Sequence, residues 1–151
     1  MPAAIGLFPF YDEPAKTRAL TLTTTAQFGS VLMADVVTDP SSAKATTGAG
    51  VTGIVGVVNT SQGDPNNSGL FPVGGTVDGA HGGIVPVLFD ANVILTREAT
   101  IISGATAGTA KVLGAEGAPY DVIGYYAGQN KTIGASPDLG SVRLDIHRVE
   151  A

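Results

Sequence analysis

The sequence predicts an all-β protein built from short antiparallel strands and tight turns. Runs rich in Val, Ile, Leu and Thr are interrupted at close intervals by glycine, a pattern typical of strands joined by turns. The clearest runs are residues 53–58, 82–89, 122–126 and 139–146. No window carries an apolar helical stripe with capping residues, and 26–35 is the segment where a helix is hardest to exclude.

Composition supports one domain with an aliphatic core. The 151 residues are 44% hydrophobic but only 6% aromatic, and Trp is absent. The core must therefore be built from Val, Ile, Leu and Ala, with glycine allowing close backbone approach. Charged residues make up 14%, about half the usual share. Either a partner or further copies cover part of the surface, or Thr, Ser, Asn and Gly supply its polarity.

Charge and cysteine content argue against several functions. The net charge is −5 and no run of Lys and Arg occurs, which disfavours nucleic-acid binding. Cysteine is absent, so disulfides and thiolate metal sites are excluded. The first residues lack the basic and continuous apolar stretches of a signal peptide, and no segment has the composition of a membrane span. We therefore expect a soluble protein made in the cytoplasm, with neither membrane nor nucleic acid as partner.

Residues 1–18 differ from the rest and are expected to form an N-terminal arm. They hold three prolines, which disfavour strand pairing, and an aromatic cluster, which favours insertion into a pocket. The segment either lies on a partner or folds over the protein's own core, and we favour the partner. The arm residues expected to bind it are Phe8, Pro9, Phe10, Tyr11 and Arg18.

The β domain is expected to span 19–151. Leu20 and Leu22 share one face of its first strand, and the almost uninterrupted apolar run at 53–59 is typical of a strand buried on both faces. The other expected strands are 31–37, 45–52, 84–89, 92–96, 100–102, 110–113, 120–126 and one at the C-terminus. A glycine-rich insertion at about 60–83 is expected to project as a hairpin or as a loop between subunits or toward a host structure.

The C-terminal strand alternates cleanly. Val142, Leu144 and Ile146 fall on one face, whereas Arg143, Asp145 and His147 fall on the other. One face should meet the core and the other solvent or a partner. Tyr125 and Tyr126 could stack on sugars or bases; because neighbours on a strand point to opposite faces, we expect one ring in the core and one at an interface.

Motifs for catalysis or cofactor binding are weak. Residues 48–53 fit the spacing of a dinucleotide-binding loop, but strand-forming residues follow where that motif needs a helix. A metal site would need the fold to bring His81 and His147 together with a carboxylate. A nucleophile-elbow sequence is absent, and the acidic residues are scattered. We expect no metal or cofactor, and a protein that is not an enzyme.

The order of these segments resembles the small head-decoration, or capsid cement, proteins of phages. The elements that carry the resemblance are Gly29-Ser30-Val31-Leu32, the Gly-Ile-Val-Gly-Val-Val strand at 53–58, Val85-Pro86-Val87, Ile101-Ile102-Ser103-Gly104, Lys111-Val112, Ile123-Gly124 and Gly140-Ser141-Val142-Arg143-Leu144. The likeness covers roughly residues 29–149, and the insertion at 62–83 is longer than that pattern expects.

The resemblance implies a small β-barrel or β-tulip with a flexible N-terminal arm. It implies a homotrimer at three-fold positions on the outer surface of an icosahedral phage capsid. The arm would reach over the major capsid protein, where it could add a strand to one of its sheets. The function implied is structural, namely stabilisation of the virion. The alternative is a glycan-binding or adhesion β domain of a tail or fibre.

Overall fold

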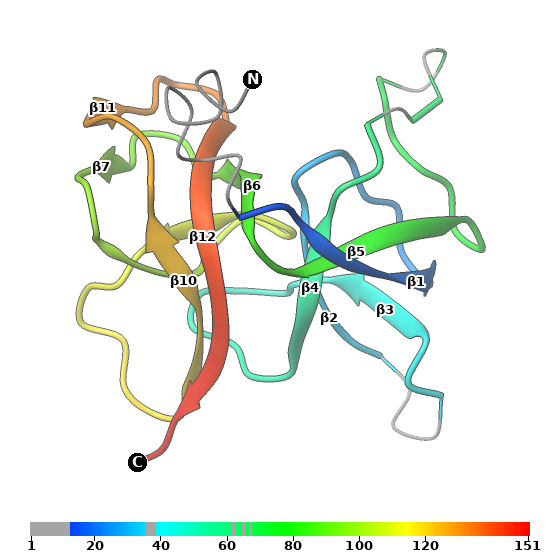
Figure 1. The fold of residues 1–151 in the computed structure, drawn as a ribbon, viewed down its shortest axis with the longest axis horizontal. Coiled ribbons are helices and arrows are strands. Elements are labelled where there is room, and N and C mark those ends of the chain that lie inside the picture. The colour runs from blue at the N-terminus through cyan, green and yellow to red at the C-terminus, as the bar shows by residue number, and fades with distance from the viewer. Residues whose placement is uncertain (1–12, 36–38, 62, 65, 67) are drawn as a thin grey trace, which may run out of the picture.

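The computed structural model describes residues 13–35, 39–61, 63–64, 66 and 68–151. About half of the chain lies in strands and the described residues contain no helix, which confirms the all-β prediction. The strands form two closed five-stranded barrels side by side (Figure 1).

The first barrel contains the N-terminal strands. Its strands are β1 (Lys16–Leu22), β2 (Val31–Ala34), β3 (Ser42–Ala45), β4 (Ile54–Val58) and β5 (Thr76–Gly82), closed in the order β1-β3-β2-β4-β5. β1 runs parallel to β3, and the other neighbours are antiparallel. An aliphatic cluster contributed by all five strands belongs to this barrel, including Leu20, Leu32, Ala43, Val58 and Val77.

The second barrel contains β6 (Ile84–Phe89), β8 (Thr100–Ser103), β9 (Ala110–Val112), β10 (Tyr120–Tyr126) and β12 (Asp138–Val149). It closes in the order β10-β12-β6-β9-β8. Two short strands, β7 (Ile94–Leu95) and β11 (Lys131–Thr132), pair beside it. A single residue, Gly83, separates β5 from β6, and its φ of 85° allows the chain to turn from one barrel into the next.

The two barrels have the same topology. When the five strands of each are counted in chain order, both close as first-third-second-fourth-fifth, with the first and third strands parallel. The register also repeats. The parallel pair is Leu22 with Ala43 in one barrel and Phe89 with Ala110 in the other. An irregularity between the second and fourth strands recurs, with Leu32 opposite Gly56 and Ile101 opposite Gly124. The two barrels are therefore structural repeats of the same fold.

A shared glycine marks the repeat most clearly. Gly56 on β4 and Gly124 on β10 both lie where the next strand passes very close. A β-carbon on Gly56 would lie 2.8 Å from the carbonyl oxygen of Ala80, and one on Gly124 would collide with the carbonyl oxygen of Arg143. Ala80 and Arg143 hold equivalent positions in the fifth strands, opposite Val57 and Tyr125 respectively. In both barrels, the backbone of the fifth strand therefore passes too close to leave room for a side chain at this position.

The barrels are packed together rather than separate. A second apolar cluster contains the interior of the second barrel together with Val31, Ile54, Val57 and Ala80 of the first. The sequence led us to expect one small barrel. The structure contains two, joined through a common core.

Two expected boundaries also differ. β1 begins at Lys16, three residues before the expected start of the β domain, and Arg18 pairs with Gly79 of β5 instead of lying in an arm. The segment expected as a glycine-rich insertion at about 60–83 includes β5, a full strand of the first barrel. Residues 1–12 lie outside the described residues.

Candidate interaction surfaces

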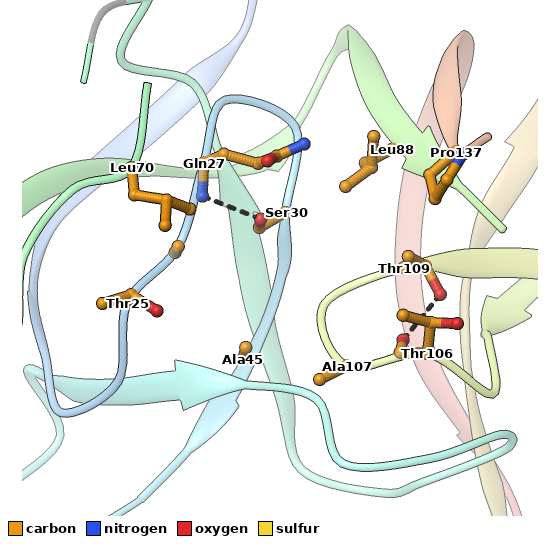
Figure 2. Close-up of a pocket in the computed structure, with 11 residues that line it drawn as sticks. Thr25, Gln27, Ser30, Ala45, Leu70, Leu88, Thr106, Ala107, Thr109 and Pro137 are labelled. Carbon is orange, nitrogen blue, oxygen red and sulfur yellow. Dashed lines mark hydrogen bonds between the residues drawn. The ribbon is translucent and has the colours of Figure 1, made fainter. Parts of the chain in front are cut away.

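A hollow of about 390 Å³ opens between the two barrels (Figure 2). The residues that line it are mostly small or uncharged: Thr25, Ala26, Gln27, Ser30, Ala45, Leu70, Leu88, Thr106, Ala107, Thr109 and Pro137. Because no acidic or basic side chain among the described residues lines this hollow, its described lining offers no group for general acid–base catalysis.

Two hydroxyl groups at the hollow, those of Ser30 and Thr109, are engaged within the protein. Ser30 Oγ accepts a hydrogen bond from the Gln27 amide at 3.0 Å, and Thr109 Oγ1 donates to the Thr106 carbonyl at 2.6 Å (Figure 2). The backbone also crosses between barrels here, since the Val31 amide donates to the Gly108 carbonyl at 2.8 Å. The hollow is thus bordered by the contacts that join the barrels.

Asp121 is the main polar link between the barrels. Its buried carboxylate accepts hydrogen bonds through Oδ2 from the amides of Gly53 and Ile54, at 2.8 and 2.9 Å. Oδ1 accepts from Arg148 Nε at 3.1 Å. Asp121 belongs to β10 of the second barrel, whereas Ile54 begins β4 of the first and Gly53 immediately precedes it. The carboxylate therefore replaces solvent for two amides at the junction.

Ser103 adds a second link to the same segment. Its buried hydroxyl accepts from the Val51 amide and donates to the Gly48 carbonyl, both at 2.9 Å. Residues 48–53, which match the spacing of a dinucleotide-binding loop, are thus held by the second barrel and lead into a strand. This geometry lacks the helix N-terminus that would bind a pyrophosphate.

The outer face of the second barrel carries an ordered polar group. The Arg143 guanidinium lies 5.9 Å from the centroid of the Tyr125 ring, and its Nη2 donates to Glu98 Oε2 at 3.1 Å. Tyr125 and Arg143 are half-buried, whereas Glu98 is exposed. A stacked Tyr–Arg pair held by a carboxylate is typical of residues that contribute strongly to protein interfaces.

Tyr126 lies on the opposite face, as alternation along the strand predicts. Its ring is buried and packs edge-on against Phe89 with centroids 6.2 Å apart. The hydroxyl donates to the Gln129 carbonyl, and burial raises the pKa of this phenol. Tyr126 is therefore a core residue and offers no stacking surface to a sugar.

The predicted arm residues Phe8, Pro9, Phe10 and Tyr11 lie outside the described residues. The described chain begins at Glu13, whose carbonyl accepts a hydrogen bond from the Ile84 amide at 3.0 Å. A hollow of about 680 Å³ surrounds this point and is lined by Glu13, Pro14, Ala15, Lys16, His81, Gly82, Gly83, Leu144, Asp145 and Ile146. The segment expected to form the arm thus joins the protein beside an open groove between the barrels.

The histidines do not form a metal centre with other residues in the described part of the chain. His81 and His147 are both exposed. No group of three or more His, Cys, Asp or Glu in residues 13–35, 39–61, 63–64, 66 and 68–151 could hold a metal ion. Within the same ranges, no helix is long and apolar enough to cross a membrane.

No protein-family model matches this chain, and no curated protein matches it. The functional inference therefore rests on the sequence pattern and on the geometry.

Proposed function

We propose that this protein decorates the outer surface of an icosahedral phage capsid and stabilises it, acting as a trimer at three-fold positions. The major capsid protein is its partner, and residues 1–12 supply the binding arm together with the adjoining groove. The function is mechanical, because each trimer would bridge several capsid subunits and weak contacts would add through multivalency.

The observation that carries the proposal is the position of the motifs that resemble decoration proteins. Each of them lies on or runs into a strand of one of the two barrels: β2, β4, β6, β8, β9, β10 and β12. The resemblance therefore follows the order of the structural elements. It extends across two barrels, whereas the resemblance implied one.

The disposition of buried polar groups supports a binding role. In the described residues, no buried side-chain nitrogen or oxygen lacks a hydrogen-bond partner. Asp121 and Ser103 hold backbone at the barrel junction, and Thr46 accepts from the Gly108 amide at 3.1 Å. These groups serve the fold, whereas the Tyr125–Arg143–Glu98 group points outward and is available to a partner.

Co-sedimentation with purified expanded capsid shells tests this function. We expect the full chain to bind the shells saturably, to resist competition by double-stranded DNA, and to raise the temperature at which the shells open. A chain that does not sediment with expanded shells would refute the proposal.

The arm is tested by a truncation chosen from the structure. Deletion of 1–18 would remove three residues of β1 that pair with β5, so folding and binding would be lost together. Deletion of 1–12 leaves every described strand intact and should reduce shell binding at least tenfold without changing the far-UV circular dichroism spectrum. Phe8→Ala and Phe10→Ala should each weaken binding, since aromatic anchors dominate such contacts. Unchanged affinity of the 1–12 deletion would show that the arm does not bind.

The alternative of a glycan-binding tail or fibre domain is favoured by one observation. Tyr125 is half-exposed beside Arg143, an arrangement on which a sugar ring could stack. A glycan array probed with the full chain and with Tyr125→Ala distinguishes the two functions. Binding that depends on Tyr125, with no binding to shells, would support the alternative.

A further inference from the structure

The repeat assigns a role to a face of the second barrel that lies at the surface of the described residues. In the first barrel, Val31, Val57 and Ala80 form one row across β2, β4 and β5, with Val57 opposite both of the others. All three are completely buried. They belong to the cluster shared with the second barrel, whose β12 lies against β4 and β5. One barrel therefore binds the other through this row.

The second barrel has the same row in the same register. Tyr125 lies opposite Thr100 of β8 and Arg143 of β12, as Val57 lies opposite Val31 and Ala80. These three side chains are half-buried, and the described part of the chain has no third barrel to cover them. The buried row of the first barrel consists of Val, Val and Ala, whereas the equivalent row at the surface of the second barrel consists of Thr, Tyr and Arg.

The face that covers the first barrel also has a counterpart. Val85 and Leu144 of the second barrel lie in the cluster that buries the first row. Their register equivalents in the first barrel are Arg18 and His81, which are both exposed and line one hollow of about 380 Å³ beside Ile146 of the second barrel. The residues equivalent to the two halves of the junction have thus both changed from apolar to polar.

Charged side chains lie on both surfaces. The exposed carboxylate of Glu98 lies at the Thr100–Tyr125–Arg143 row, where it pairs with Arg143. Arg18 lies on the other surface beside His81, and the hollow next to it contains Lys16 together with the carboxylates of Glu13 and Asp145. Glu98 of one surface and Arg18 of the other are opposite charges that would favour association.

We propose that the Thr100–Tyr125–Arg143 row binds a second copy of this chain, which presents the Arg18–His81 surface of its first barrel. Each contact between copies would repeat the contact between the barrels within one chain. The arrangement is head-to-tail, so it produces a closed ring or an open filament rather than a two-fold dimer. It specifies how the copies of the proposed trimer would meet, but it requires no capsid.

Cysteine trapping tests this contact directly, because the natural chain has no cysteine. Arg143→Cys and His81→Cys would be purified separately, mixed and oxidised. We expect a mixed disulfide between the two variants and little self-crosslinking of either alone. Arg143→Cys mixed with Val73→Cys is the control, since Val73 is exposed on the turn before β5, outside both surfaces. Sedimentation of the wild-type protein should show species heavier than one 15.1 kDa chain, and Tyr125→Ser should shift them toward the single chain.

Each other result overturns the proposal. Self-crosslinking of Arg143→Cys would indicate a two-fold contact, and trapping by Val73→Cys at the same level would indicate random collision. A wild-type protein that forms oligomers without the mixed disulfide would have its interface elsewhere. The same mixture bound to capsid shells separates the two proposals: shell binding without the disulfide refutes only the contact, whereas the disulfide without shell binding refutes only the capsid function.

Discussion

Replacement of Asp121 by alanine should destabilise the whole molecule, because this carboxylate joins the barrels. The substitution leaves the amides of Gly53 and Ile54 without their acceptor. A buried amide without a partner costs about 1–3 kcal/mol, and the Gly53 amide is only partly buried, so we expect a loss of about 2–4 kcal/mol. For a chain of this size the melting temperature should fall by roughly 5–15 °C.

Chemical denaturation followed by tyrosine fluorescence and circular dichroism measures this loss, with hydrogen exchange reporting on the two amides. Arg148→Ala is the matched control. It removes the other partner of Asp121, but the Arg148 side chain is 47% exposed, so the expected cost is about 0–1 kcal/mol. Asp121→Ala should also speed exchange of the Gly53 and Ile54 amides, whereas Arg148→Ala should not. If both variants have the same stability, Asp121 does not hold the junction.

Two further predictions concern the repeat and the surface electrostatics. Gly124→Ala and Gly56→Ala should both lower the unfolding midpoint, because the added methyl group forces β10 or β4 away from the next strand, and Gly124→Ala should have the larger effect. Gly134→Ala is the control and should change stability little, since there is open space for its methyl group. Equal midpoints for all three variants would contradict the close approach. Hydrogen bonds from the Lys111 side chain and then from the Gly114 amide hold the pKa of Glu116 below its usual value. The ionised Glu116 carboxylate therefore stabilises the fold at pH values above the pKa that this group has in the unfolded chain, and this contribution is lost as the pH falls. Glu116→Gln should flatten the acid side of the stability–pH curve by less than about 1 kcal/mol, and an unchanged curve would contradict the assignment.

Much of the fold could be predicted from local pattern. The apolar runs that became β4, β6 and β10 were identifiable because buried strands need little more than Val, Ile and Leu with turns at their ends. The opposite orientations of Tyr125 and Tyr126 followed from strand alternation. β5 was missed because it is rich in glycine, although Gly79 is required there: a β-carbon at this position would collide with the side chain of Leu20.

The repeat could not be predicted from the sequence because equivalent positions in the two barrels carry side chains of different size. Leu22, Val58 and Val77 of the first barrel correspond in register to Phe89, Tyr126 and Gly140 of the second. A β-carbon on Gly140 would lie 2.9 Å from the Phe89 ring and 3.1 Å from the Tyr126 ring. The second barrel therefore fills its interior with two aromatic rings and no side chain at the third position. Such compensation preserves packing while it removes the sequence similarity that would reveal a duplication.

The candidate surfaces depend on this hidden symmetry. Alternation of β12 indicated that Arg143, Asp145 and His147 face away from the core, but it could not distinguish solvent from a partner. The register supplies the missing comparison, because Arg143 stands where Ala80 is covered by a barrel of the same fold. Few charges, two similar barrels and an equivalent face at the surface of the described residues are the features from which we propose that further copies of the chain are added. If Tyr125→Ser leaves both self-association and shell binding at the wild-type level, the Thr100–Tyr125–Arg143 row does not bind a partner, and the contact between barrels is made only within the single chain.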